Sequence, residues 1–526
     1  MVRTRQKRAA LLPLLAVSAI ALTVAGDALA RDPPAQGRRG AARIAAKVRP
    51  INRIAPAPQF RAASSTNRPA APWGRRGPAG AAAAFPHAAA ANSFPRNQEA
   101  RWAAHRREIM AVRSRLPQHP LPGERGFTGV PPPGERRFIS NEMVFHVAPD
   151  ISRQAVEDVA RRLNLSMIGA HNVALTGGTV YRLRLTDGRS VADAVHALEA
   201  EKLGVAQPNY VFQLQQDPTL AARTQGGEPD QYVVNKLRLG EVHRVATGSN
   251  VLVAVIDSEI DSRHPDLAGA FVERFDAVGR PDKPHVHGTG MAGAIVAHRA
   301  LMGIAPGAKI LAVHAFSPDA GESAKATTQH ILAGLEWAIA KGARVINMSF
   351  AGPFDPMLAL AMKKAHEKGV VLIAAAGNLG PKSPPLYPAA DPNVIAVTAV
   401  DQNDHLFAGA NQGPYIAVAA PGVNVLEPAP DSGYQITTGT SVAAAHVSGV
   451  AALMLERDHS LDPDKVHEIL TASAKPVASG GRNDQYGWGL VDPARALLDV
   501  DAQLASEQHN SSVRPAAAKP GTLSSR

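Results

Sequence analysis

The chain contains no cysteine, and aromatic residues make up only 5% of its 526 residues. Without cysteine there is no disulfide framework, no thiolate metal site and no cysteine nucleophile, which excludes iron–sulfur proteins and zinc fingers. Hydrophobic residues nevertheless account for 45% of the chain, enough for a large core. The length allows two or three folded units together with unfolded segments.

Long hydrophobic runs are also scarce. One apolar run extends from Ala9 to Ala25, follows a basic stretch that ends at Arg8, and is followed by the small residues Ala28-Leu29-Ala30. The run is interrupted by Pro13 and is shorter than the roughly 20 residues that a membrane span needs. We therefore predict an export signal over residues 1–30, cleaved after Ala30, rather than a membrane anchor. The predicted location is secreted, periplasmic or at the cell envelope.

Acidic residues are scarce in one region. Residues 31–137 carry 20 Lys and Arg against 5 Asp and Glu, so this segment and the basic signal account for the net charge of +11. Repeated Pro and Gly interrupt every candidate helix in the segment. We predict a disordered basic segment over 31–137; the alternative interpretation is electrostatic contact with anionic envelope surfaces or nucleic acid. We expect no specific binding of nucleic acid.

Residues 138–215 have the pattern of a small domain. Extended apolar segments at 143–147 and 205–214 flank two segments with helical spacing, at 152–163 and 190–203, and Gly177-Gly178 lies inside a predicted hairpin at 173–185. The order β-α-β-β-α-β is that of a split βαβ domain. The polar residues 216–230 are the predicted linker.

Residues 231–500 alternate apolar strands with amphipathic helices. The predicted strands are 251–256, 309–316, 344–349, 370–376, 394–400 and 416–420, with helices at 327–340 and 356–368. Strands that are apolar on both faces belong between two layers of helices. The predicted fold class is therefore α/β, a three-layer sandwich with a parallel sheet, preceded by the small α+β domain. Residues 501–526 are predicted to be a disordered tail.

Polar side chains stand where the predicted strands end or helices begin. Asp257 follows the first strand, His287 opens a helical stretch, and Ser441 precedes a long apolar helix. Taken singly, these residues are typical of turns and helix caps. Taken together, they supply a nucleophile, its general base and the carboxylate that orients the base. Asn378 and the backbone N–H of Ser441 can donate to an oxyanion, and sites in parallel sheets form at this edge.

The sequence resembles the subtilisin-like serine peptidases. The resemblance covers roughly residues 232–500 and rests on four motifs in order: Val255-Ile256-Asp257-Ser258, His287-Gly288-Thr289, Ala375-Ala376-Gly377-Asn378 and Gly439-Thr440-Ser441. It implies an endopeptidase with Asp257, His287 and Ser441 as the catalytic triad and Asn378 in the oxyanion hole. It further implies two substrate-binding edges, Ser349-Phe350-Ala351-Gly352 and Ala375-Ala376-Gly377.

The resemblance also gives the small domain a role. Residues 138–215 resemble the inhibitory propeptide of the family, with Pro208-Asn209-Tyr210 near its end. We therefore expect a self-inhibited precursor that matures by cleavage within Gln215–Glu228. The expected partners are protein or peptide substrates and the chain's own pro-domain, and the expected state is a monomer. No charged residue occurs in the two edges, which indicates an apolar or broad primary pocket.

Three positions depart from the family pattern: Glu259 and Gly290 replace the usual Gly and His, and Ala445 replaces the usual Pro. They leave open a second hypothesis, a catalytically impaired domain that acts as a cell-envelope binding or scaffold protein. An α/β-hydrolase esterase is excluded, because it needs G-x-S-x-G and a serine that precedes the acid and the histidine.

We expect no cofactor. His285 and His287, two positions apart on a loop, are a weak signal beside the spacing that zinc enzymes use. Residues 297–303, where many family members bind calcium, lack an oxygen-rich ligand set. We therefore predict no metal at these two places.

Overall fold

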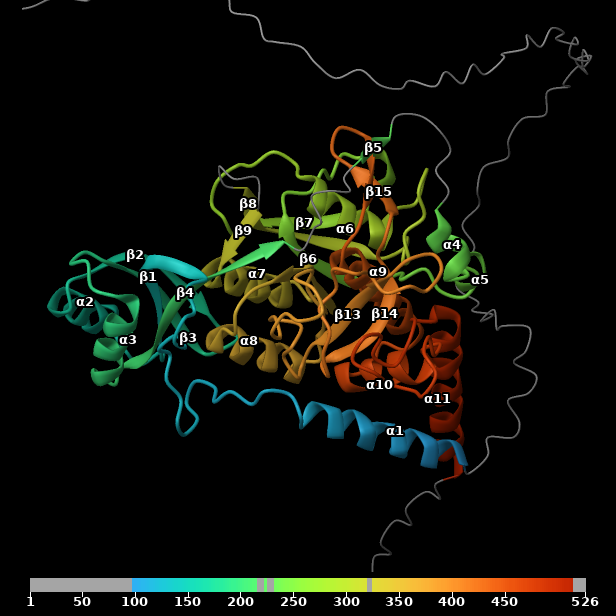
Figure 1. Ribbon diagram of the computed structural model, residues 1–526, viewed down its shortest axis with the longest axis horizontal. Helices are drawn as coiled ribbons and strands as arrows, with labels where there is room; N and C mark the ends of the chain where they lie inside the picture. The colour runs from blue at the N-terminus through green and yellow to red at the C-terminus, as the bar shows by residue number, and fades with distance from the viewer. Residues whose placement is uncertain (1–96, 215–221, 225–230, 319–323, 514–526) are drawn as a thin grey trace, which may run out of the picture. The chain divides into compact units, whose positions relative to one another are not determined.

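The computed structural model describes residues 97–214, 222–224, 231–318 and 324–513. The predicted signal (1–30) and residues 31–96 of the basic segment lie outside the described residues. All described residues belong to one compact unit, in which a small domain adjoins a larger α/β domain (Figure 1). None of the described helices combines the length and the apolar character needed to cross a membrane.

The larger domain is built on a parallel sheet. Its strands are β6 (Leu252–Ser258), β7 (Phe271–Asp276), β8 (Lys309–Pro318), β10 (Val345–Met348), β12 (Val371–Ala375), β13 (Ile395–Val400) and β14 (Ile416–Pro421). They lie in the order β14-β13-β12-β10-β6-β8, and β7 also pairs with β8. The six predicted strands are confirmed to within two residues at each end.

Helices cover both faces of this sheet. The helices are α4 (Tyr232–Lys236), α5 (Leu239–Val242), α6 (Val286–Val296), α7 (Thr328–Ala340), α8 (Pro356–Glu367), α9 (Thr440–Arg457), α10 (Pro463–Ser473) and α11 (Pro493–Val513), and η2 (Pro265–Leu267) is a short 3-10 turn. In β6, Val253 and Val255 pack with the layer that contains α6 and α9. The alternate residues Ala254 and Ile256 pack with the layer that contains α7 and α8. The three-layer sandwich is therefore confirmed.

The small domain has the predicted order of elements. It comprises β1 (Phe138–Val147), α2 (Arg153–Arg162), β2 (Leu165–Val173), β3 (Gly178–Leu185), α3 (Val191–Ala200) and β4 (Gly204–Leu214). Ser152 and Ser190 cap the two helices, because each side chain accepts a hydrogen bond from a backbone N–H of the first turn. The helices cover one face of the antiparallel sheet β4-β1-β3-β2 and bury its core.

The two sheets are joined through β4. Its last residues pair antiparallel with β9 (Ala324–Thr327) and with β11 (Phe350–Ala351), both in the larger domain. A smaller antiparallel sheet lies apart, with the order β15 (Val425–Ala429), β16 (Gly433–Thr437), β5 (Ala222–Thr224). The end of the small domain is thus an internal strand of the combined sheet, which brings it to the carboxyl edge of the parallel strands.

Two predictions of disorder are wrong in part. Residues 97–113, inside the predicted disordered segment 31–137, form helix α1 (Asn97–Arg113), which lies along α10 (Figure 1). Residues 97–116 contain neither Pro nor Gly, so no helix breaker acts there, although the surrounding composition suggested one. The predicted tail 501–526 begins as helix, because α11 continues to Val513. Residues 514–526 lie outside the described residues.

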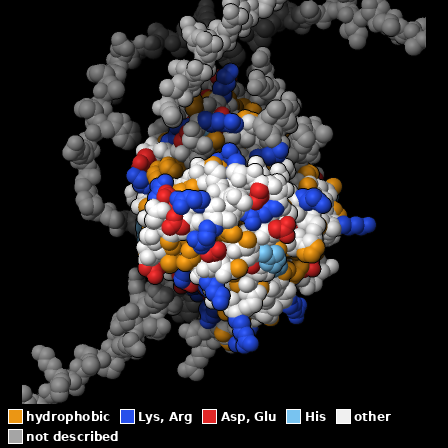
Figure 2. All heavy atoms as spheres, turned by 90° about the vertical axis from the view of Figure 1, so that its left-hand side faces the viewer, with side chains coloured by type: hydrophobic (Ala, Val, Ile, Leu, Met, Phe, Trp, Pro, Cys, Tyr) orange, Lys and Arg blue, Asp and Glu red, His pale blue; other side chains and the backbone are white. Residues whose placement is uncertain are grey.

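The outer face of the small domain carries both signs of charge. Figure 2 shows basic and acidic side chains interspersed there, with hydrophobic side chains scattered singly. The ion pair Arg153–Glu157 lies within α2, and Arg162–Glu201 joins the end of α2 to the end of α3. This face therefore lacks the single-sign field that electrostatic recognition of an anionic surface would use.

Candidate active site

Asp257 lies at the carboxyl end of β6 and is fully buried. Its Oδ1 accepts hydrogen bonds from the backbone N–H of Ser258 at 2.7 Å and from the Ser258 hydroxyl at 3.0 Å. The Ser258 hydroxyl in turn accepts from the backbone N–H of Gly288, in the first turn of α6, at 3.1 Å. These bonds fix the carboxylate relative to the helix that carries the histidine.

His287 is held against this carboxylate. Its Nδ1 lies 2.8 Å from Asp257 Oδ1 and 2.9 Å from Oδ2, and both side chains are completely buried. His285 caps the helix, because its Nδ1 accepts from the backbone N–H of His287. Burial lowers the pKa of His285, which favours the neutral ring that this acceptor role needs. The buried Nε2 of His287 has no hydrogen-bond partner.

Ser441 is in the first turn of α9, which packs against α6. Its hydroxyl donates to the backbone carbonyl of Ser349 at 3.2 Å. The structure thus brings Asp257 and His287 into direct contact. The serine hydroxyl is turned towards the predicted substrate-binding edge that begins at Ser349, and His287 Nε2 makes no hydrogen bond to it.

Asn378 follows β12, and its side chain is oriented by the residue before the serine. Asn378 Oδ1 accepts from the backbone N–H of Thr440 at 3.1 Å and from its hydroxyl at 2.8 Å. The donor end of the amide, Nδ2, is therefore at the opposite side from Thr440. A side-chain amide and the backbone N–H at a helix N-terminus can both donate to an oxyanion.

The two predicted substrate-binding edges lie beside this centre. Phe350 and Ala351 form β11, and Gly377 is fixed because its N–H donates to the Thr440 hydroxyl at 3.1 Å. Ala375 ends β12 and Ala376 donates to Val397 of β13. All seven residues of the two edges, Ser349–Gly352 and Ala375–Gly377, are buried.

Strand β4 occupies the first of these edges. Leu214 pairs with Phe350 and Gln213 with Ala351, while Val211 to Gln213 pair with β9 on the other side. Phe212 is fully buried, with its ring 5.9 Å from that of Phe350. A Cβ at Gly352 would lie 2.4 Å from the Phe212 ring, so only glycine leaves room for it.

The small domain also covers the N-termini of α7 and α8. Gln207 of β4 is completely buried; its amide nitrogen donates to Asp355, the cap of α8, at 2.6 Å, and its oxygen accepts from Met357 N at 3.0 Å. Thr328 donates to Asp355 at 2.6 Å and accepts from the backbone N–H of Tyr210. These contacts fix the small domain against the first turns of α7 and α8.

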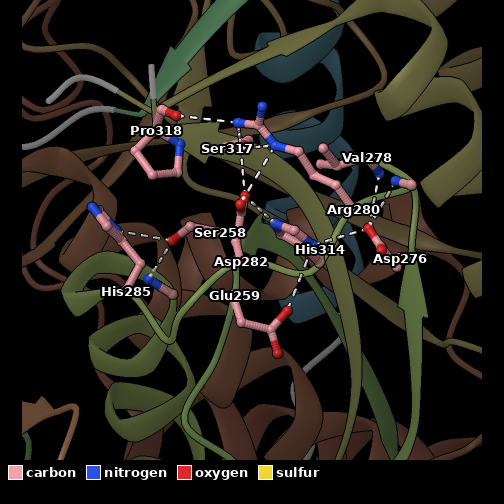
Figure 3. A network of polar contacts seen from close by, with 12 residues as sticks. Ser258, Glu259, Asp276, Val278, Arg280, Asp282, His285, His314, Ser317 and Pro318 are labelled. Atoms are coloured by element: carbon pink, nitrogen blue, oxygen red, sulfur yellow. Dashed lines mark hydrogen bonds and ion pairs between the residues drawn. The ribbon is translucent and has the colours of Figure 1, made fainter. Parts of the chain in front are cut away.

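Glu259, the first departure from the family pattern, is part of a polar network (Figure 3). Its carboxylate pairs with Arg274 of β7 and lies 3.5 Å from Nδ1 of the buried His314. His314 also contacts Asp276 at 2.9 Å and Asp282 at 3.1 Å. Glu259 therefore points neither at solvent nor at Asp257. The network connects β7 and β8 to the loop that leads to His287.

The second departure, Gly290, leaves room for a buried carboxyl group. A Cβ at Gly290 would lie 2.6 Å from Oε2 of Glu427, which β15 places beneath the first turns of α6. Neither oxygen of Glu427 has a hydrogen-bond partner, and burial raises the pKa of Glu427 to about 7. At the third departure, beside Ala445, His446 Nδ1 bonds to the Pro421 carbonyl at 2.8 Å, and burial lowers its pKa to about 4.

Metal ligands do not gather in the described ranges. No group of three or more His, Cys, Asp or Glu side chains among them has an arrangement that could hold a metal ion. His285 and His287 use their Nδ1 atoms as a helix cap and as a partner of Asp257.

Several residues with a role in this arrangement were not found from the sequence: Gln207, Thr328, Asp355 and Glu427, the strand β9, and helix α1. Asp355-Pro356 is a recognisable helix start, which could have identified the cap. Gln207 and Glu427 carry no such signal, because each acquires its role only through a partner distant in sequence.

Comparison with known proteins agrees with this geometry. The family described as the subtilase family matches residues 248–489. Fervidolysin of Fervidobacterium pennivorans is 30% identical over 394 residues, which cover 64% of this chain and 54% of that protein. The minor extracellular protease Epr of Bacillus subtilis is 33% identical, and the match covers 50% of this chain and 40% of Epr. The chain thus spans about half the length of these two relatives.

A shorter relative is matched almost completely. Thermitase of Thermoactinomyces vulgaris is 37% identical over 275 residues, covering 51% of this chain and 95% of thermitase. The crystal structure of fervidolysin, described as a keratinolytic enzyme related to subtilisin, superposes with a TM-score of 0.58 at 25% identity, covering 73% of this chain and 64% of that one. With the same fold and the motif residues gathered at one edge of its sheet, the chain belongs to the subtilase family.

Proposed function

We propose that this chain is an exported serine endopeptidase made as a self-inhibited precursor. The observation that carries the proposal is the position of β4, which runs antiparallel between β9 and β11 as an extended peptide substrate would. It leads towards Ser441 and the buried pair Asp257–His287. A strand held in this way blocks the cleft against other peptides.

The chemistry follows from the roles that the geometry permits. Ser441 Oγ attacks the peptide carbonyl carbon while its proton passes to His287 Nε2, which has no competing partner. Asp257 stabilises the imidazolium, and Asn378 Nδ2 with the Ser441 N–H binds the oxyanion. The C–N bond then breaks, and the amine leaves with the proton from His287. Water then takes the place of the amine: its oxygen attacks the acyl carbon while its proton passes to His287. The bond from that carbon to Ser441 Oγ breaks, and His287 returns the proton to the serine.

The strand register supports one maturation site. Phe350 pairs with Leu214 and Ala351 with Gln213. Ser349 precedes Phe350, and its carbonyl accepts from the Ser441 hydroxyl, so the last pair of this register lies one residue from the serine's partner. We therefore propose that the chain cuts the bond between Gln215 and Gln216, inside the window 215–228 predicted from the sequence. Residues 215–221 lie outside the described residues.

The same register supports a substrate preference. With residue 215 on the acyl side of the cut, Phe212 stands three positions before it, in the space left by Gly352. We propose that peptides with a large apolar or aromatic residue at that position are preferred, because full burial of such a side chain contributes about 1.5–3 kcal/mol.

Casein hydrolysis by the purified full chain, with intact masses, tests the proposal. The wild type should shorten to a product that begins at Gln216 and should hydrolyse casein. Ser441→Ala should stay uncut and lose at least about a thousandfold in rate. Ser262→Ala, an exposed serine of the same domain, is the matched control and should behave as wild type. The N-terminus of the uncut precursor should also be determined. A precursor that begins at Arg31 would support cleavage of the predicted export signal after Ala30.

One observation favours a second function, a catalytically impaired domain that binds at the cell envelope. The Ser441 hydroxyl donates to the Ser349 carbonyl, and His287 Nε2 makes no hydrogen bond to it. If the wild type and Ser441→Ala both remained full length and inert, this second function would replace the first. We favour the peptidase, because a binding protein has no need of the buried Asp257–His287 pair.

A further inference from the structure

Helix α1 makes a second, separate contact between the region before the small domain and the larger domain. Arg106 Nη1 donates to both oxygens of Glu468 in α10, at 2.9 and 3.1 Å, and Arg113 Nη1 donates to Asp464 at 2.6 Å. His105 Nε2 lies 2.8 Å from the Thr471 hydroxyl. This contact is on α10, whereas β4 contacts β9 and β11 at the cleft.

The contact has an apolar part as well as a charged one. Ile109, in α1, and Leu116, just after it, are buried at 6% and 5% exposure. Trp102 packs against the core of the larger domain, and the Lys465 ammonium lies 5.1 Å from the centre of its ring. The Glu468 side chain is only 4% exposed, so it relies on Arg106 and Lys465 for its neutralisation. An unpaired carboxylate at that burial would be costly.

The residues after α1 connect this contact to the small domain. We call residues 97–137 the strap. His119 stacks on Phe354 with ring centres 4.0 Å apart and bonds to the Tyr387 hydroxyl at 3.1 Å. Further on, the backbone N–H of Gly129 donates to Glu199 of α3 at 2.7 Å. The strap therefore runs along the larger domain from α10 to the small domain, in one described stretch (Figure 1).

We propose that the face of α10 formed by Asp464, Glu468 and Thr471 is a docking site for α1, which makes the cleaved pro-segment a bivalent inhibitor. The proposal rests on the proposed function, since cleavage after residue 215 leaves the strap and β4 on one fragment. That fragment is held at the cleft and at α10. When β4 leaves the cleft, the docked α1 keeps it nearby at high effective concentration, and rebinding competes with substrate.

The first test does not depend on catalysis by the chain itself. Residues 216–221 of the full-length Ser441→Ala protein are replaced by the recognition sequence of an unrelated, sequence-specific protease. After cutting, the dissociation rate of the N-terminal fragment is measured by size-exclusion chromatography over time. Arg106→Gln with Arg113→Gln should dissociate about tenfold faster or more, since truncating a charged partner acts mainly on the off-rate.

Arg107→Gln with Arg115→Gln is the matched control. It removes the same charge from the same segment, and both side chains are exposed and have no described contact in the fold. Its dissociation rate should equal that of the parent. Equal rates for the test pair and the control pair would overturn the proposal. The separated C-terminal fragment has the same sequence in all variants. Its melting, followed by circular dichroism, should therefore be the same, which checks that misfolding of the larger domain does not cause the effect.

The second test uses the chain with Ser441 intact. Hydrolysis of a small peptide should begin after a lag. The lag should be shorter in the double variant Arg106→Gln with Arg113→Gln and unchanged in the control double variant, and the final rate should be the same in both. An unchanged lag in an active protein would contradict bivalent inhibition. A protein without any activity would instead contradict the proposed function, and the dissociation rates of the first test would still decide the docking site.

Discussion

Strand β4 and helix α1 bind the larger domain by different kinds of interaction. β4 pairs through backbone groups on both sides and buries Phe212 completely. α1 binds through side chains, chiefly Arg106 and Arg113. Backbone pairing depends little on sequence and is insensitive to salt, whereas ion pairs depend on two particular residues each. The difference means that the two contacts can be broken independently.

The largest effect should come from the β4 contact. Phe212→Ala removes a fully buried ring, and such truncations cost about 3–5 kcal/mol. We expect the cut pro-segment to dissociate at least about a hundredfold faster, measured as for the strap variants. Phe127→Ala, a partly exposed phenylalanine on the same fragment, is the control. If Phe212→Ala changed the rate less than the Arg106/Arg113 pair does, α1 rather than β4 would be the main contact.

The stability of the larger domain should depend on pH through a group that takes part in neither the β4 contact nor the α1 contact. Burial raises the pKa of Glu427 to about 7 from an ordinary 4.5, with Asp257 and His287 as the charged groups nearby. The folded state therefore holds a proton that the unfolded state has released. Stability is complete below about pH 4.5 and decreases as pH rises through 7, by about 3 kcal/mol.

Chemical unfolding of the Ser441→Ala protein across this pH range measures the decrease in the unfolding free energy. Glu427→Gln, which cannot ionise, should remove most of the slope and be the more stable protein above pH 7. The control is Glu456→Gln, a carboxyl that accepts backbone hydrogen bonds from Thr247 and Gly248. An unchanged slope in Glu427→Gln would mean that another group takes up the proton.

Two glutamates near β7 sharpen the comparison between buried and exposed ion pairs. The Glu259 side chain, which pairs with Arg274, is 11% exposed. The Glu273 side chain, which pairs with Lys341, is 45% exposed. Glu259→Gln should lower the unfolding free energy by about 1–2 kcal/mol and reduce kcat/KM several-fold, because the loop before His287 loses a support. Glu273→Gln should change stability by about 0.5 kcal/mol or less and leave kcat/KM unchanged. Similar results for both would show that the network has no role in positioning His287.

The smallest effect should come from salt. Raising NaCl from about 0.05 to about 0.5 M should speed dissociation of the cut pro-segment only a few-fold, because the Arg106 and Arg113 pairs are partly exposed and screened. The double variant Arg106→Gln with Arg113→Gln should have lost most of this salt dependence of the dissociation rate, while Phe212→Ala should retain it. A salt response that survived in the Arg106/Arg113 pair would place the ionic contribution elsewhere.

The sequence predicted the parallel sheet, the place of Asp257 at the end of a strand and the place of Ser441 at the start of a helix, because all three depend on local patterns. Apolar runs identify buried strands, and the carboxyl ends of parallel strands are where sites form, so a nucleophile, a base and a carboxylate found there together point to chemistry. The strap was missed because composition averaged over 31–137 hid a stretch without Pro or Gly, bracketed by Pro95 and Pro117. Glu427 was missed because its surroundings come from α6, far away in sequence.

The hydrogen bond between Arg106 and Glu468 joins residues 362 positions apart. During synthesis α1 is made long before α10, so this contact is one of the last that the chain can form. The small domain folds from local contacts and can reach β9 and β11 earlier. Docking of α1 therefore requires that α10, near the far end of the larger domain, has already been made and folded.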